Sequence, residues 1–381
     1  MGRIWARRPP GTRFTEWDPD MPKESSRKFS CFQQGAERLK AAMAGESDRI
    51  PVSAQMHEFV AAQRGIPRRE FFTNPEIMVP AILDAQAEYN LDVASVTFDV
   101  YNIEAEGLGQ RVVWSDAFMP DVDRTEMLIR DREDLSRIRT PDFESAGSFS
   151  RVVRMHALFK KLTGLEPTLS FCAPFSLAAN LRGIEPLLLD IYDDPKFAAH
   201  LFDRITEEVL APWIRFQRKH FPHATLLNGV DATASPPIVN LPILKQWVIP
   251  YILRLRELCG PEVCVANWVG ERYVANPEEM LDLKLIVGPG SLLGQDPDVE
   301  ELGPAFYKQY AVRHNLPLVL GIGASFLAQS TPAVIAERVL NYVQVGGRGG
   351  RFALYLCNIG ASTPPENVKA AIEAAHAYRV S

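Results

Sequence analysis

The 381-residue sequence predicts a single (β/α)8 barrel (TIM barrel) with an N-terminal extension. From Ile50 onward, short β-branched runs alternate with longer helical patterns, which is typical of βαβ units in a parallel sheet. The runs expected to be strands span residues 50–55, 93–98, 167–172, 224–230, 263–268, 291–294, 316–322 and 351–357. Their number is the one that closes such a barrel.

The residues at the predicted helix starts support the same alternation of strands and helices. Five residues that commonly cap helices stand directly before a proline, which suits the first helical position: Asn74, Asp194, Asn276, Thr331 and Thr363. Two of them are followed three residues later by a glutamate, as in a capping box. We therefore expect a helix to begin at each of these prolines.

Composition narrows the class of protein. The net charge of −6 provides no basic field for nucleic acid, and no apolar run approaches the length of a membrane span. Five scattered cysteines argue against a disulfide framework and for a reducing, cytoplasmic setting. We expect residues 1–49 to form an extension, residues 50–381 to form one catalytic barrel, and the arginine-rich start to pack on another subunit of a homo-oligomer or stay loose.

In this fold, functional side chains lie at the carboxyl ends of the strands. His57 is the one histidine of seven at a predicted strand exit, which makes it the leading acid, base or ligand, with a structural role as the alternative. We expect proton transfer to involve His57, Asp231 or Glu271, although Asp231 could instead cap a turn. The predicted substrate-binding residues are Gln55, Asp99, Tyr101, Phe175, Asn228, Asn267, Trp268, Gln295 and Asn358; Trp268 could equally pack in the core.

Three segments resemble the uroporphyrinogen decarboxylase superfamily. Residues 171–185, FCAPFSLAANLRGIE, are similar to its "GPFT-A-x-L-x-G" region, and residues 37–52 are similar to its N-terminal "ER…DR-x-P-V". Residues 346–357 with 363–367 look like its closing "GC…TP-x-EN". This resemblance also implies a (β/α)8 barrel.

The resemblance distinguishes two branches. True decarboxylases carry an arginine-bearing segment after the first strand that holds the substrate's carboxylates, whereas this chain reads AQMHEF at 54–59, with no arginine before Arg64. Asp99 does fall where the decarboxylases have their pyrrole-binding aspartate. Without the arginines, a polycarboxylate tetrapyrrole is not the expected substrate.

The other branch contains cobalamin-linked methyltransferases and epoxyalkane:coenzyme M transferases. In these proteins a His-x-Cys pair at strand five and a cysteine after strand eight hold zinc, which activates a thiol. Cys357 matches the last ligand, but the pair reads Cys264-Val265-Ala266, so Cys264 is only a conceivable substitute and zinc is doubtful.

The resemblance therefore implies a methyltransferase acting on a small methylated substrate. The methyl acceptor would be a corrinoid, tetrahydrofolate or a thiol, with a corrinoid protein as a possible partner. The alternatives are zinc-dependent opening of an epoxide by coenzyme M, a decarboxylase-like lyase, and a non-catalytic binding barrel. A metal-free transferase is the favoured reading.

Overall fold

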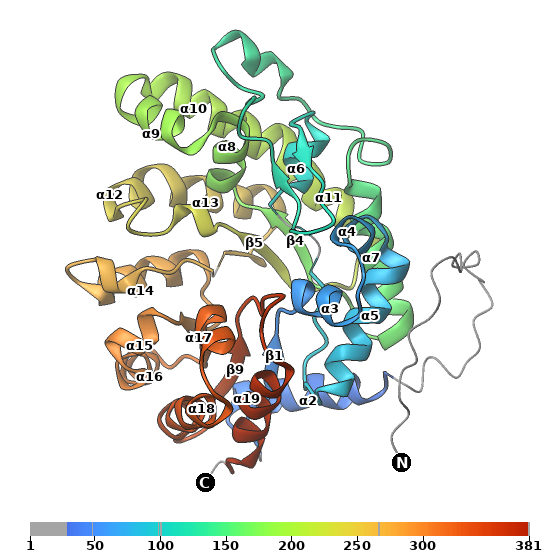
Figure 1. The fold of residues 1–381 in the computed structure, drawn as a ribbon. Coiled ribbons are helices and arrows are strands. Elements are labelled where there is room, and N and C mark those ends of the chain that lie inside the picture. The colour runs from blue at the N-terminus through green and yellow to red at the C-terminus, as the bar shows by residue number, and fades with distance from the viewer. Residues whose placement is uncertain (1–28, 48, 98, 100, 266, 380–381) are drawn as a thin grey trace.

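The computed structural model describes residues 29–47, 49–97, 99, 101–265 and 267–379. Seven parallel strands line its centre: β1 (Val52–Ala54), β4 (Leu169–Cys172), β5 (Leu227–Val230), β6 (Val263–Val265), β7 (Leu292–Gln295), β8 (Leu318–Ile322) and β9 (Phe352–Leu356). They pair in the orders β4-β5-β6 and β7-β8-β9-β1. Because the last strand pairs with the first, the sheet curls back on itself, and the predicted barrel is confirmed (Figure 1).

The prediction of a strand at residues 93–98 is wrong for the part that the structure describes, because residues 93–97 do not form a strand. Phe98 lies outside the described residues. Val93 N still donates to Val52 O of β1 (3.4 Å), but further along the segment side chains take up backbone groups in place of a neighbouring strand. The Gln86 amide accepts from Ser95 N (3.2 Å) and donates to Ser95 O (2.7 Å), and the His57 ring bonds to Thr97 O. A side chain that satisfies a backbone group competes with the ladder of a sheet.

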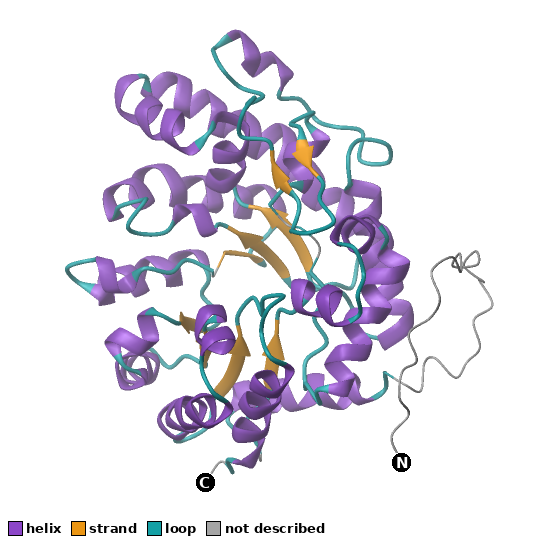
Figure 2. Cartoon of the chain, viewed as in Figure 1, coloured by secondary structure: helices purple, strands orange, loops and turns teal. Residues whose placement is uncertain are grey.

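Helices surround the strands (Figure 2). Their bounds are α2 (Cys31–Ala44), α3 (His57–Gln63), α4 (Arg68–Thr73), α5 (Pro75–Glu88), α6 (Ile103–Gly107), α7 (Phe149–Thr163), α8 (Pro174–Arg182), α9 (Ile184–Asp193), α10 (Pro195–Arg204), α11 (Ala211–His220), α12 (Leu241–Ile243), α13 (Ile249–Cys259), α14 (Pro277–Val287), α15 (Asp298–Leu302), α16 (Pro304–Arg313), α17 (Ala324–Gln329), α18 (Pro332–Gly346) and α19 (Pro365–Ala377). None of the helices in the described residues is both long and apolar enough to cross a bilayer.

Sequence reasoning missed a small antiparallel hairpin, β2 (Val112–Val113) with β3 (Asp121–Val122). It lies in the long connection between α6 and α7. Strands of two residues are too short to produce a recognisable alternation of apolar and polar residues.

The capping predictions hold at three of five helices. Asn74, Asp194 and Thr331 accept hydrogen bonds from backbone N–H groups at the starts of α5, α10 and α18. Asn276 precedes α14 without such a bond. The prediction at Thr363 is wrong, because α19 begins at Pro365, one residue later than expected.

Candidate active site

The interior of the barrel is lined by uncharged side chains. Outward positions are identified by their contacts with the helices. A Cβ on Gly294 would meet Tyr307 of α16, and Phe171, the register partner of Gly229, lines a small cavity with Val152 of α7 and Trp213 of α11. Because side chains alternate along a strand, the neighbouring positions face inward. Register partners at these positions are Ser53, Tyr355, Gly321 and Gln295 across β1-β9-β8-β7, and Ser170, Asn228 and Cys264 across β4-β5-β6. None of these seven residues carries a fixed charge.

Asp231 lies just past β5 and is fully buried. One carboxylate oxygen accepts from Ser176 N of α8 (2.9 Å) and the other from Trp268 Nε1 (3.3 Å). Burial raises the pKa of Asp231 to about 6, and the bonds from Ser176 and Trp268 oppose that rise. Its side chain thus joins α8 to the exit of β6, rather than capping its own turn.

Asn267 and Tyr101 continue this network toward the interior. The backbone N–H of Asp231 donates to Asn267 Oδ1 (2.8 Å), and Asn267 Nδ2 donates to Tyr101 Oη (3.0 Å). The carbonyl of Tyr101 accepts from Asn180 Nδ2 of α8 (2.6 Å). Asn267, which follows β6, and Asn180 of α8 therefore both donate to Tyr101.

Cys357 faces Gln295 rather than a set of metal ligands. Its thiol donates to Gln295 Oε1 (3.1 Å), and burial, with the nearby charge of Asp296, raises the pKa of the thiol. Cys264 lies inside β6, level with Asn228. The described part of the chain contains no group of three His, Cys, Asp or Glu side chains able to hold a metal. The predicted ligands, Cys357 and Cys264, therefore do not fit a zinc site.

His57 and Glu271 are occupied elsewhere. Burial lowers the pKa of His57 to about 4, so its ring is neutral near pH 7 and bonds to Thr97 O. Glu271 forms a buried ion pair with Lys284 of α14 (2.6 Å), and Lys284 also donates to Leu293 O of β7 (2.6 Å). Burial raises the pKa of Glu271 to about 7, against the attraction of Lys284. Both predicted proton carriers thus have structural partners.

The predicted substrate-binding residues are dispersed. Phe175 is fully buried and stacks on Phe202 of α10 (6.0 Å between ring centroids), in the helical layer. Asp99 is buried and accepts from Tyr101 N (3.4 Å) and from Asn102, and burial raises its pKa to about 7. Asn228 and Asn358 are exposed. The interior lining therefore retains Gln55, Tyr101, Asn228, Asn267 and Gln295, while Trp268 stands behind Asn267 against Asp231.

Sequence reasoning missed Tyr355 and Ser176. The hydroxyl of Tyr355 donates to Gln55 Oε1 (2.9 Å) from the middle of β9. Ser176 lies in the first turn of α8 and presents its N–H to Asp231. Side chains alternate along a strand, so Tyr355 lies on the same face as Cys357. This alternation was the one sequence signal that could have identified Tyr355 as an interior residue.

Glu104 is a buried carboxyl beside this network. Its Oε1 accepts from Cys172 N (3.0 Å), whereas its Oε2 has no hydrogen-bond partner among the described residues. Burial raises the pKa of Glu104 from 4.5 to about 8. The folded protein therefore holds this proton more tightly than the unfolded chain, so this group's contribution to stability is lost as the pH rises toward 8.

We expect Glu104→Gln to flatten the dependence of stability on pH. The amide keeps an acceptor for Cys172 N but cannot ionise, so the free energy of unfolding should fall less between pH 5 and pH 8 than in the wild type. Urea unfolding at both pH values measures this slope, with the exposed Glu37→Gln as control. Equal slopes in wild type and Glu104→Gln would contradict a neutral, buried Glu104.

Gly321 keeps room at the interior end of β8. A Cβ there would lie 2.7 Å from Cys357 Sγ and 3.0 Å from Gln295 Cγ, closer than such contacts allow. We expect Gly321→Ala to lower the free energy of unfolding by about 1–3 kcal/mol through overpacking. Gly290→Ala is the matched control, since a Cβ there meets nothing within 4 Å. Chemical denaturation compares the two, and equal stabilities would contradict this packing.

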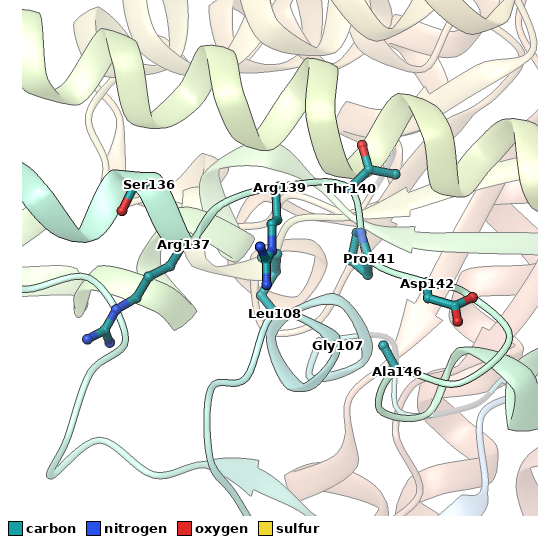
Figure 3. A pocket seen from close by; sticks show the side chains of 9 residues that line it. All are labelled: Gly107, Leu108, Ser136, Arg137, Arg139, Thr140, Pro141, Asp142 and Ala146. Atoms are coloured by element: carbon teal, nitrogen blue, oxygen red, sulfur yellow. The ribbon is translucent and has the colours of Figure 1, made fainter.

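A surface cavity of about 490 Å³ has a lining that shares no residue with the Asp231–Tyr101 network. Figure 3 shows the side chains that line it. It is lined by Gly107, Leu108, Ser136, Arg137, Arg139, Thr140, Pro141, Asp142 and Ala146. Arg137 is ion-paired with Asp134 (3.1 Å). The cavity belongs to the connection that carries the hairpin, not to the strand ends.

The fold and this lining define a (β/α)8 barrel with a polar candidate site at the carboxyl ends of its strands. The chain belongs to the uroporphyrinogen decarboxylase (URO-D) family, whose model matches residues 34–378. The resemblance drawn from the sequence motifs is confirmed.

Two relatives are methyltransferases of Methanosarcina mazei. A methylated-thiol–coenzyme M methyltransferase is 24% identical over 234 residues, which are 59% of this chain and 61% of that protein, so the match spans less than two thirds of the relative. A solved structure described as a methyltransferase has a TM-score of 0.69 at 20% identity and covers 88% of this chain and 96% of that one. At this identity the structural likeness shows the fold alone. Both names agree with the branch favoured from sequence.

Proposed function

We propose that the protein is a methyltransferase. It takes a methyl group from a small methylated substrate at the barrel mouth and passes it to a corrinoid, a folate or a thiol. The observation that carries this proposal is the uncharged, hydrogen-bonding interior row, on a fold shared with a methyltransferase.

The same row argues against a decarboxylase-like role. A tetrapyrrole with many carboxylates needs cationic side chains to replace its hydration. None of the seven inward positions named above is cationic, and Arg64, the first arginine after β1, pairs with Glu88 on the helical layer (2.6 Å). A small substrate with little charge fits this lining better.

The residues likewise give no support to zinc-dependent epoxide opening. In that reaction, zinc held by the protein binds the thiolate of coenzyme M. Cys357, the candidate zinc ligand, is buried against Gln295 and lacks companion ligands among the described residues. We therefore favour direct methyl transfer.

Methyl transfer places a geometric demand on the site. The acceptor attacks the methyl carbon from the side opposite the leaving atom, so the leaving atom must lie inward and the methyl group must face the open mouth. A corrinoid, carried by a partner protein, or a folate would approach from that side. Asp231 is fully buried, so we assign it the positioning of Trp268 and Ser176 rather than contact with substrate.

Transfer of a deuterated methyl group tests the proposal. The purified protein is incubated with trideuteromethyl ethers and sulfides and, separately, with cob(I)alamin, tetrahydrofolate or coenzyme M. We expect mass spectrometry to find the label on one acceptor. Unlabelled acceptors with every donor would contradict methyl transfer, and consumption of coenzyme M by an epoxide would favour the alternative reaction.

A further inference from the structure

The orientation of the Asn267 amide is determined by its neighbour. The backbone N–H of Asp231 can only donate, so the atom that faces it at 2.8 Å must be the amide oxygen. The amide nitrogen then faces Tyr101 Oη at 3.0 Å and must donate to it. The phenolic oxygen of Tyr101 is therefore an acceptor in this contact.

A second donor lies near the same oxygen. The backbone N–H of Ala232 favours the ionised phenol and so opposes the rise in the pKa of Tyr101. A phenolic oxygen accepts through its lone pairs and carries one proton. Because Asn267 donates to this oxygen, the O–H proton must point elsewhere, and none of the described residues accepts it. The side chain of Tyr101 is partly exposed, which leaves room for a ligand to reach this O–H.

The nearby hydroxyl of Tyr355 behaves differently, because it is already donated to Gln55 Oε1. The Gln295 amide oxygen is likewise taken by the Cys357 thiol, which leaves its NH2 group as a donor. Burial keeps the pKa of Tyr101 above its ordinary value, so the phenol retains its proton. Tyr101 and Gln295 thus each leave a hydrogen-bond donor free in the interior.

We propose that Tyr101 donates its free O–H to an oxygen atom of the substrate, and that the methyl donor is therefore a methyl ether rather than a methyl sulfide. The inference rests on the proposed methyl transfer. An ether oxygen accepts hydrogen bonds, whereas a thioether sulfur accepts them only weakly.

The hydrogen bond also suits the chemistry of transfer. The bond between the methyl carbon and oxygen breaks while a new bond forms to the corrinoid, folate or thiol acceptor. The electron pair of the broken bond stays on oxygen, where the Tyr101 O–H meets the developing charge. A donor aimed in advance at that atom stabilises the transition state.

A matched pair of probes tests the proposal without any methyl acceptor. Anisole and thioanisole differ only in the atom that bears the methyl group, and NMR titration gives the affinity of each for the protein. We expect Tyr101→Phe to weaken anisole about 10-fold and to change thioanisole less than about 2-fold. Tyr251→Phe, which removes a hydroxyl in α13 outside the barrel interior, is the control and should change neither. Circular dichroism verifies that both variants are folded.

Three results would overturn the proposal: unchanged anisole affinity in Tyr101→Phe, equal losses for both probes, or no binding of anisole to the wild type. The proposed function fails separately. A protein that binds anisole through Tyr101 yet labels no acceptor refutes methyl transfer alone. One that transfers methyl groups from sulfides at full rate in Tyr101→Phe refutes the ether assignment alone.

Discussion

Lys284→Met is expected to lower the free energy of unfolding by about 3–5 kcal/mol, because it leaves the Glu271 carboxylate buried without its cation. Lys284 is 4% exposed and Glu271 0%, with 2.6 Å between Nζ and Oε1. The second oxygen of Glu271 has no hydrogen-bond partner among the described residues. Urea unfolding at pH 8 measures the loss.

The protonation of Glu271 determines how the stability loss in Lys284→Met depends on pH. Burial raises the pKa of Glu271 to about 7 even beside Lys284, so the unpaired carboxyl can take up a proton at lower pH. The loss in Lys284→Met should therefore be smaller at pH 5 than at pH 8. The double variant Lys284→Met with Glu271→Gln is the control and should recover most of the stability. Equal losses in the single and double variants would contradict a buried charge as the cause.

Asp231→Ala is expected to cost about 3 kcal/mol of stability and to abolish binding at the mouth. The change leaves Ser176 N and Trp268 Nε1 without an acceptor, and each such buried donor costs about 1–3 kcal/mol. Trp268 is 1% exposed, so water cannot readily replace the carboxylate. Thermal unfolding and NMR titration with anisole measure the two effects.

Asp231→Asn keeps the shape of the side chain but removes its charge, so it shows how much of the stability loss is due to the charge. Its amide oxygen can still accept from one donor, but its NH2 group then faces the other. We expect a loss between those of the wild type and Asp231→Ala. Wild-type stability in Asp231→Ala would show that the carboxylate does not hold α8 and the β6 exit together.

The barrel was predictable because its signals are local. Apolar runs with helical caps at Asn74, Asp194 and Thr331 marked the βα units, and seven of the eight predicted strand regions contain strands. The segment at 93–97 looked like a strand by its β-branched residues, but Gln86 and His57 take its backbone groups. No periodicity in the sequence reports such a contact.

The candidate site was predictable as a region but not as a set of roles. Reading the strand exits found Tyr101, Asn267 and Asp231, which the structure brings together. It also selected His57 and Glu271, whose partners, Thr97 O and Lys284, become visible only in the packed structure. Residue type and strand position indicate which groups stand near the mouth, whereas hydrogen-bond partners determine which of them are free.

A structure with a bound methyl ether tests the central claim most directly. We predict that the ether lies at the carboxyl ends of the strands, with its oxygen within hydrogen-bond distance of Tyr101 Oη and its methyl group toward the open mouth. An ether bound instead in the cavity beside Arg137 and Arg139, with the barrel interior unchanged, would contradict the proposed site.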